Sequence, residues 1–466
     1  MPHISQLPQD ILSHILKNLL PPLPNSPSIR VVKAKPYLGM KLTSSFLTAR
    51  LISRTMASAS CKWFWRILDL KLPMVNVASL HIFKHLHLTP STIEHTRFLF
   101  LRIWAPPNDE DIQFLISLMR RATSLDYLKI TFPSEDRNMM GSEDVEKMNK
   151  CSMILKRYVT TCPGLDTLVV HGLPKWTFEQ PGRTINNLRN IHSSLSTDLI
   201  HLLVLCPNIK SLSLVQGQLY SDDRHHLRCR PGLFPWTSIN ELRFGFLRVE
   251  DLHAILDNYL IWKANFFPTT LALRELIVMC DLDLDDVNRL LIVFNNETLR
   301  FLSLNGLAGV TSRLLSRISN SFSGLQRLYL YTRDHWGPWL ENMSAILPHL
   351  RNLRHLTHLS WMYLPLPVPP DPLPEIIVPA TITESYLLFT PILAGTCPRL
   401  QYVHVLYEEE GFTFKVLRDL GPQPDRVGDF ECVWLGEQGE EQEEEEERWE
   451  MRTSFWTTEN ERVLLL

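Results

Sequence analysis

The stretch Leu325-Gln326-Arg327-Leu328-Tyr329-Leu330 has aliphatic residues at its first, fourth and sixth positions. The same pattern, L-x-x-L-x-L with any aliphatic or aromatic residue as L, returns along most of the chain. Copies begin at Leu125, Leu165, Ile209, Ile239, Leu273, Leu299, Leu325, Leu356 and Leu400, and weaker copies begin at Thr96 and Leu188. Recurrence of one short pattern at intervals of tens of residues predicts a repeat architecture.

Segments with helical spacing of apolar residues lie between these copies. The clearest run from 111 to 121, from 198 to 205 and from 287 to 294. The repeating unit is therefore predicted to be strand, turn and helix. Such a unit cannot cover its own apolar face. Stacked units solve this with a concave parallel sheet and helices outside, which is an α/β fold.

The repeat pattern resembles that of leucine-rich repeats. The steps between copies range from about 21 to 44 residues, and no regular Asn follows the strand. The resemblance therefore implies an irregular leucine-rich-repeat solenoid, expected over residues 73–436. The proline-rich stretch 364–379 is expected to be an inserted loop, which either is a solvated surface loop or serves as a docking motif.

Three of the copies are introduced by a Cys-Pro pair. The pairs are Cys162-Pro163, Cys206-Pro207 and Cys397-Pro398. A small apolar Cys fits a core, and the proline stops the preceding helix before the strand begins. A metal or nucleophile site would need His or acidic partners at ligand spacing, and none is adjacent in sequence. We interpret these cysteines as structural.

The amino-terminal segment is expected to be helical. Leu7-Pro8-Gln9-Asp10-Ile11-Leu12 continues with Ile15, Leu16 and Leu19, which are spaced as one face of a short helix that Pro21-Pro22 ends. A second helical stretch is predicted at about 42–59 and includes Leu51 and Ile52. A third apolar group contains Trp63, Phe64, Trp65, Ile67 and Leu68.

This order of residues is similar to the F-box, a small helical module of ubiquitin-ligase receptors, over about residues 5–68 within a module at 1–72. Ser53 stands where the family often has Cys, and residues near 25–41 look like an insertion. The resemblance implies binding to a Skp-type adaptor and, through it, to a cullin. It implies adaptor contacts by Leu7, Pro8, Ile11, Leu12, Ile15, Leu16, Leu51 and Ile52. The alternative is that these helices only cap the first repeat.

Residues between the apolar repeat positions are expected to face the concave side, because side chains alternate along a strand. Aromatic and Arg side chains anchor protein interfaces, so this face is the predicted substrate-binding surface. Its candidate residues are Tyr127, Lys129, His171, Arg243, Phe301, Arg327, Tyr329, Tyr331, Tyr402 and His404. The alternative is ordinary aromatic packing between neighbouring strands.

The charge is concentrated in one tract near the carboxyl terminus. Glu437–Glu450 holds nine glutamates and one arginine, so this tract carries −8 and the rest of the chain +5, for a net charge of −3. Because acids and bases are mixed elsewhere, no nucleic-acid partner is expected. Residues 437–466 are expected to form a disordered tail. The tract either is simply solvated or masks basic positions such as Arg224 and Arg228.

No catalytic, phosphate-binding or metal-binding motif is recognisable in the sequence. The cluster Arg224–Arg230 contains His225, His226 and Cys229, which could suggest zinc, but adjacent His side chains point apart and a fourth ligand is missing. A basic surface loop is the preferred interpretation. A metal-dependent enzyme built on these three residues remains an alternative. No catalytic residue, metal or cofactor is therefore expected.

The sequence shows no secretory signal and no stretch that could span a bilayer, so no membrane association is expected. Eight cysteines without a C-x-x-C pair suggest reduced thiols and an intracellular protein, cytoplasmic or nuclear. Together these features predict a non-enzymatic substrate receptor of an SCF-type ubiquitin ligase with an unknown protein substrate. The main alternative is a repeat scaffold that is not attached to a ligase.

Overall fold

The computed structural model describes fourteen stretches of the 466 residues. They are 67–73, 93–132, 141–171, 184–217, 219, 221–229, 233–266, 271–295, 298–333, 343–361, 390, 392–407, 410–418 and 430–434. These residues fall into two compact units that meet in the sequence between Ile209 and Lys210. The predicted adaptor-binding residues, the proline-rich loop 364–379 and the tail 437–466 lie outside the described residues.

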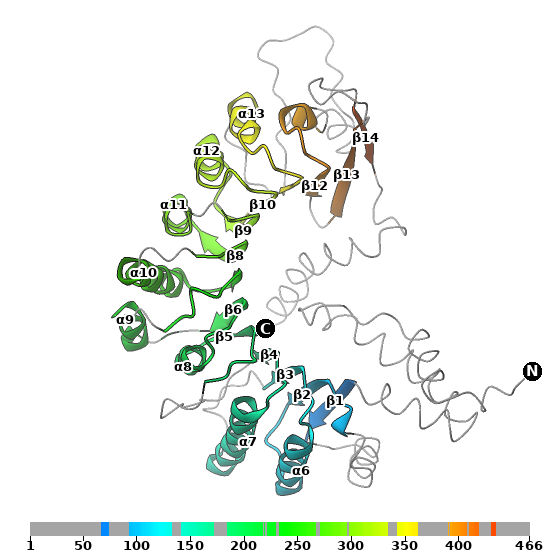
Figure 1. The fold of residues 1–466 in the computed structure, drawn as a ribbon, viewed down its shortest axis with the longest axis vertical. Coiled ribbons are helices and arrows are strands. Elements are labelled where there is room, and N and C mark those ends of the chain that lie inside the picture. The colour runs from blue at the N-terminus through cyan, green and yellow to red at the C-terminus, as the bar shows by residue number, and fades with distance from the viewer. Residues whose placement is uncertain are drawn as a thin grey trace, which may run out of the picture. The chain divides into compact units, whose positions relative to one another are not determined.

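The first unit is a parallel sheet of five strands with three described helices, two of which connect successive strands. Its elements are β1 (Ile67–Leu72), β2 (Phe98–Ile103), α6 (Asp109–Arg121), β3 (Tyr127–Thr131), α7 (Ser142–Thr161), β4 (Thr167–His171), β5 (Asn190–Leu195) and α8 (Thr197–Leu205). The strands lie in the order of the sequence, and α6 contacts α7 (Figure 1). The predicted helices at 111–121 and 198–205 are confirmed as α6 and α8.

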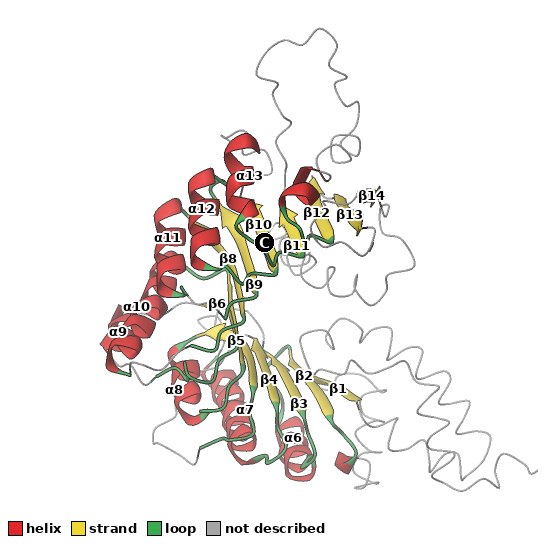
Figure 2. Ribbon diagram, turned by 45° about the horizontal axis from the view of Figure 1, so that its top comes forward, coloured by secondary structure: helices red, strands yellow, loops and turns green. Residues whose placement is uncertain are grey.

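The second unit repeats the same alternation. Its elements are β6 (Ser211–Gly217), α9 (Ser221–Cys229), β7 (Glu241–Gly245), α10 (Val249–Asn265), β8 (Glu275–Leu282), α11 (Leu284–Val293), β9 (Phe301–Leu307), α12 (Ser312–Ser321), β10 (Arg327–Thr332), α13 (Met343–Arg351), β11 (His358–Trp361), β12 (Tyr402–Tyr407), β13 (Glu410–Arg418) and β14 (Phe430–Trp434). Strands β6 to β12 are parallel and consecutive. Helices α9 to α13 lie on one side of them (Figure 2).

The predicted α/β class with a mostly parallel sheet and alternating helices is confirmed. The sheet of the second unit ends differently from the expected solenoid, because β13 pairs antiparallel with β12 and β14 pairs antiparallel with β13. An antiparallel neighbour needs only a short turn, whereas a parallel one needs a crossover. Two residues, 408 and 409, separate β12 from β13, so this end of the chain leaves the repeat pattern.

The L-x-x-L-x-L positions form the core between each sheet and its helices. In the copy at Leu325, Leu325, Leu328 and Leu330 are fully buried, and the corresponding residues of the other nearby copies have the same burial. The three Cys-Pro cysteines join this core, with Cys206 and Cys397 at 0% exposure and Cys162 at 7%. Burial raises the pKa of Cys206 to about 12, so it stays a neutral thiol. The burial of these cysteines supports their interpretation as structural residues of the core.

One backbone arrangement recurs at the start of β3 to β5 and of β7 to β12, and it holds these copies in register. The carbonyl of Lys210 accepts hydrogen bonds from the backbone N–H groups of Asn240 and Glu241, at 2.8 and 3.0 Å. The carbonyl of Asn240 accepts in the same way from Arg274 and Glu275, at 2.7 and 3.1 Å. The second residue of each copy therefore lies beside the second residue of the next.

Local sequence signals explain where several helices begin. Asn108 before α6 and Asp283 before α11 each form a capping box, in which the cap side chain and the third helical residue bond each other's backbone N–H. Ser196 caps α8 and Thr311 caps α12 with one such bond. These caps satisfy N–H groups that the first turn of a helix leaves without partners.

The secondary structure of residues 67–72 differs from the prediction. The sequence predicts them as part of the helical amino-terminal module, but they form β1, which pairs with β2 along its whole length. Trp65-Arg66-Ile67-Leu68-Asp69-Leu70 fits the repeat pattern, and Leu68 and Leu70 are each 5% exposed. The sheet therefore begins before the boundary that the sequence suggested.

Gly306 in β9 is a position that only glycine satisfies. Its φ is +86°, and an added Cβ would lie 2.5 Å from the carbonyl oxygen of Cys280. We expect Gly306→Ala to lower the free energy of unfolding by about 2 kcal/mol, because both strain and a backbone clash oppose it. Urea denaturation measures this. Gly309→Ala is the control, since nothing lies within 4 Å of its added Cβ. Equal losses in the two variants would show that Gly306 has no special role.

Candidate functional site

The candidate surface is the inner face of each sheet, defined here as the face turned away from the helices. Strand register places the predicted residues in rows across it. In the second unit, Glu241, Glu275, Phe301, Arg327, His358 and Tyr402 occupy equivalent positions on consecutive strands. Arg243, Tyr329 and His404 belong to the next row, and Tyr331 to the third. The predicted residues of this unit therefore lie on one face.

Aromatic residues of β9 and β10 form a cluster on this face. The rings of Phe301 and Tyr329 meet edge to face at 4.8 Å, and those of Tyr329 and Tyr331 lie 6.5 Å apart. The Arg327 guanidinium lies 5.2 Å from the centre of the Phe301 ring. Phe301, Tyr329 and Tyr331 are only 0 to 8% exposed, so packing between neighbouring strands accounts for much of their burial.

Charged residues surround this cluster. Arg243 lies 3.5 Å from Glu241 and 4.0 Å from Glu275, and Arg327 lies 3.7 Å from Glu275. All four side chains are between 20 and 40% exposed, so solvent screens each pair and its contribution to stability is below about 1 kcal/mol. The two glutamates were not predicted. They occupy the third position of their repeat copies. Phe301 and Arg327 were predicted as substrate-binding residues because they occupy this same position.

The last parallel strands add a second group. His358 and Tyr402 stack with ring centres 4.9 Å apart, and the Lys415 ammonium lies 6.0 Å from the centre of the Tyr402 ring. His404 is 8% exposed, and burial lowers its pKa to about 4, so it is neutral at pH 7. Tyr402 and Lys415 are partly exposed, and together they can contact a partner through both a ring and a positive charge.

The first unit places its three predicted residues on its own inner face. Tyr127 is fully buried among Phe98, Phe100 and Val169, and burial raises the pKa of its phenol. Lys129 and His171 are partly exposed on neighbouring strands. The His171 and His192 rings meet edge to face at 5.1 Å. The partly exposed residues suit a contact surface, whereas Tyr127 belongs to the packing.

His171 should make stability depend on pH. Burial, with a smaller effect from Lys129, lowers its pKa from 6.5 to about 4. Between these values the unfolded chain binds a proton that the native chain does not, so stability present above pH 6.5 is lost progressively down to about pH 4. We expect His171→Gln to reduce the drop in urea midpoint between about pH 7.5 and about pH 5. Exposed His355→Gln serves as control, and an equal reduction there would contradict the prediction.

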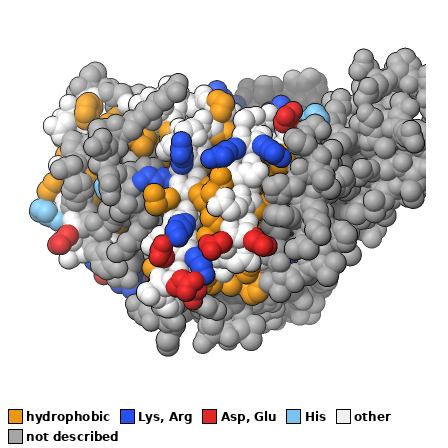
Figure 3. All heavy atoms as spheres, turned by 90° about the horizontal axis from the view of Figure 1, so that it is seen from below, with side chains coloured by type: hydrophobic (Ala, Val, Ile, Leu, Met, Phe, Trp, Pro, Cys, Tyr) orange, Lys and Arg blue, Asp and Glu red, His pale blue; other side chains and the backbone are white. Residues whose placement is uncertain are grey.

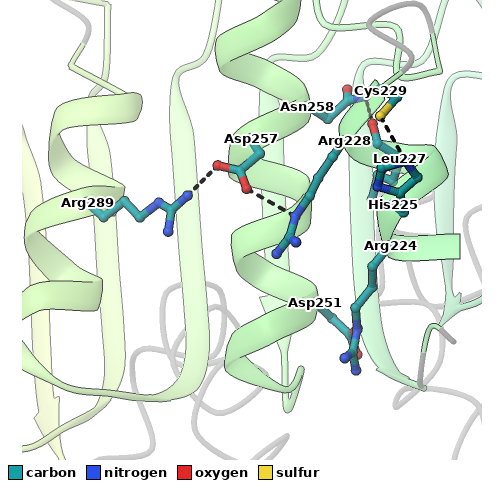
Figure 4. Close-up of polar contacts among 9 residues, drawn as sticks. All are labelled: Arg224, His225, Leu227, Arg228, Cys229, Asp251, Asp257, Asn258 and Arg289. Carbon is teal, nitrogen blue, oxygen red and sulfur yellow. Dashed lines mark hydrogen bonds and ion pairs between the residues drawn. The ribbon is translucent and has the colours of Figure 1, made fainter. Parts of the chain in front are cut away.

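The cluster at Arg224–Arg230 was predicted to be a surface loop, and this prediction is wrong: Ser221–Cys229 is helix α9. Leu227 is fully buried, and its carbonyl accepts a bond of 2.6 Å from the Asn258 side chain on α10. Arg224 lies 2.5 Å from Asp251, and Arg228 lies 3.2 Å from Asp257, which also pairs with Arg289 of α11 (Figure 4). These contacts bind three successive helices together.

The contacts of α9 also bear on the metal hypothesis. His225 and Cys229 lie one helical turn apart, with 3.6 Å between Nε2 and Sγ (Figure 4). Among the residues that the structure describes, no group of three or more His, Cys, Asp or Glu side chains could hold a metal ion. A tetrahedral zinc site needs at least three protein ligands. The described part of the cluster therefore offers two possible ligands, His225 and Cys229.

The surface carries charges of both signs. Figure 3 shows acidic as well as basic side chains on the face that it draws, with hydrophobic side chains between them. A phosphate backbone would favour a continuous basic area.

None of the described helices is long and apolar enough to cross a membrane. The chain matches no protein-family model, and a search of the curated proteins finds no relative.

Proposed function

We propose that this chain is a substrate-recognition subunit of an SCF-type ubiquitin ligase, consisting of an F-box and a leucine-rich-repeat solenoid. The observation that carries the proposal is the F-box-like order of Leu7, Pro8, Ile11, Leu12 and Ile15 ahead of a series of strand–helix repeats. The amino-terminal module would bind a Skp-type adaptor and thereby a cullin. The inner face of the repeats would bind the target protein.

The proposed mechanism is proximity. A receptor that holds a target beside the conjugating enzyme raises the effective concentration of target lysines and needs no catalytic residue of its own. The partly exposed Arg243, Arg327 and Tyr402 are the side chains that we assign to target contact. Interfaces are enriched in Arg and Tyr, which supports this choice. Neither a metal nor a cofactor has a part in this function.

Co-purification tests the adaptor contact. The tagged chain, intact and with Leu12→Asp plus Ile15→Asp, is isolated from cells, and the recovered adaptor and cullin are quantified by mass spectrometry. We expect both partners with the intact chain and neither with the double variant, because two buried charges would disrupt an apolar contact. Met153→Asp plus Ile292→Asp is the matched control, since these side chains are 70 and 68% exposed. Its partners should be unchanged.

A repeat scaffold outside any ligase is the second candidate. It is favoured by the inner face itself, where the aromatic and charged residues of β7 to β12 can bind a protein without help from the amino-terminal segment. The same experiment separates the two functions. If the intact chain recovers neither adaptor nor cullin, the receptor function is excluded and the scaffold function is supported.

A further inference from the structure

Helix α9 presents two possible metal ligands on its exposed surface. His225 and Cys229 are four residues apart, so they lie one above the other on the helix, and both side chains are exposed. The other cysteines that the structure describes are buried. The zinc-binding motif H-E-x-x-H places two ligands on a helix with this same spacing of four residues. The helix therefore holds the imidazole and the thiol where a single ion can contact both.

The distance between the two donor atoms fits a zinc ion. Zinc binds thiolate sulfur at about 2.3 Å and imidazole nitrogen at about 2.0–2.1 Å, and a tetrahedral angle then places the two donors about 3.6 Å apart. The Nε2 of His225 and the Sγ of Cys229 are 3.6 Å apart (Figure 4). The same distance suits a hydrogen bond between thiol and imidazole, which a metal ion would replace. Zinc could therefore bind both atoms with little movement of either side chain.

Contacts with α10 hold this pair of ligands in place. Leu227 lies between the two ligands in the sequence and is fully buried, and its carbonyl accepts a hydrogen bond of 2.6 Å from Asn258. One residue before the first ligand, Arg224 pairs with the fully buried Asp251. These contacts fix the rotation of α9 about its axis, with both ligands exposed. A ligand pair that is already ordered loses less conformational entropy when it binds.

The position of the pair along the helix also favours a cation. Cys229 is the last residue of α9, and the carboxyl-terminal end of a helix favours positive charge. The adjacent cation, Arg228, pairs with Asp257 of α10 at 3.2 Å, which reduces its repulsion of a bound ion. Helix geometry and the helix dipole therefore act in the same direction.

One chain supplies two of the four ligands that a closed zinc site needs. Among the residues that the structure describes, no third His, Cys, Asp or Glu side chain joins the pair. Structural zinc sites are tetrahedral, and two Cys with two His is one of their ligand sets. We propose that His225 and Cys229 form one half of a zinc site, and that the same pair from a second copy of the chain completes it. Two thiolates and two neutral imidazoles would balance the charge of Zn²⁺.

A two-fold dimer brings the two halves together. In such a dimer the same surface of both copies meets, so two identical ligand pairs approach one point on the axis. The inference goes beyond the proposed ligase function and does not depend on it. A dimer would carry two inner faces, and a target with two binding segments would be held more tightly than by one chain.

Metal titration of the full chain tests the site. The reduced chain is freed of metal by a chelator and titrated with Co²⁺ alone, whose absorption spectrum reports tetrahedral coordination and thiolate ligands. Sedimentation velocity of the chain with Zn²⁺ and with chelator gives the oligomeric state. We expect one ion for every two chains, a tetrahedral cobalt spectrum with thiolate charge transfer, and a dimer that the chelator dissociates.

Three variants identify the ligands. Cys229→Ser and His225→Ala should each lose both the cobalt spectrum and the metal-dependent dimer. His355→Ala is the matched control, because His355 is also exposed, and it should keep both. Circular dichroism shows whether the variants are folded, which we expect because the two ligand side chains are exposed.

Three results would overturn the proposal. They are no binding of metal by the native chain, one ion bound by each monomeric chain, and binding that Cys229→Ser leaves unchanged. None of these results bears on the adaptor contact, which co-purification tests separately.

Discussion

Replacement of Trp236 by alanine is expected to lower the free energy of unfolding by about 4 kcal/mol, which is a large fraction of the stability of a typical domain. Trp236 is fully buried in the connection between α9 and β7. Its ring stacks on Phe234 at 4.9 Å and meets Tyr259 of α10 edge to face at 5.2 Å. Alanine would leave a cavity beside Phe234 and Tyr259.

The polar atom of Trp236 adds to this effect. Its indole N–H donates to the Asn258 side chain at 3.0 Å, and Asn258 in turn donates to the carbonyl of Leu227 at 2.6 Å. Both Trp236 and Asn258 are fully buried, so loss of the donor removes a hydrogen bond between buried groups. Trp236→Phe keeps most of the ring and loses this bond, and we expect it to cost about 1 to 2 kcal/mol.

Urea denaturation followed by circular dichroism measures both variants. Trp104→Ala is the matched control, because Trp104 is 53% exposed and its loss should change stability by less than about 0.5 kcal/mol. The predicted order of stability is Trp104→Ala, then Trp236→Phe, then Trp236→Ala as the least stable. A Trp236→Ala chain as stable as the Trp104→Ala chain would contradict the packing described for this site.

The core of the fold was largely predictable from the sequence. The L-x-x-L-x-L pattern identified the strands from β2 to β12, because a strand buried on its helix side needs apolar residues at alternate positions. Helices α6, α8 and α11 were predictable from their apolar spacing, which reflects the same core from the other side. Strand β1 was missed, although Trp65, Leu68 and Leu70 fit the pattern, because the neighbouring residues resembled the end of a helical module.

Other features depend on contacts between distant segments. Helix α9 is strongly polar, and its helical form depends on Asp251, Asp257 and Asn258, all on α10. A polar sequence next to Pro231-Gly232 gives no local sign of such partners, so a loop was predicted. The inner-face rows were predictable from alternation. For Phe301 and Tyr329 the sequence left two alternatives, partner contact or packing between strands, and the rings pack against each other between β9 and β10.

The pair Arg224–Asp251 should be the most sensitive polar contact of the helical layer. Asp251 is fully buried, its Oδ1 accepts from the Arg224 Nε at 2.5 Å, and its Oδ2 has no partner among the described residues. Arg224→Ala would therefore leave a buried carboxylate without its cation. We expect a loss of about 3 kcal/mol in the free energy of unfolding, measured by urea denaturation.

Two further variants show whether the cost comes from the stranded charge. Arg224→Met combined with Asp251→Leu removes both charges and keeps apolar volume, so this double variant should be more stable than Arg224→Ala alone. Arg228→Ala removes a side chain that is 44% exposed and should cost less than about 1 kcal/mol. If the double variant is less stable than Arg224→Ala, the pair stabilises the helical layer by its own attraction. A double variant more stable than Arg224→Ala means that the cost of Arg224→Ala comes mainly from the buried carboxylate left without its cation.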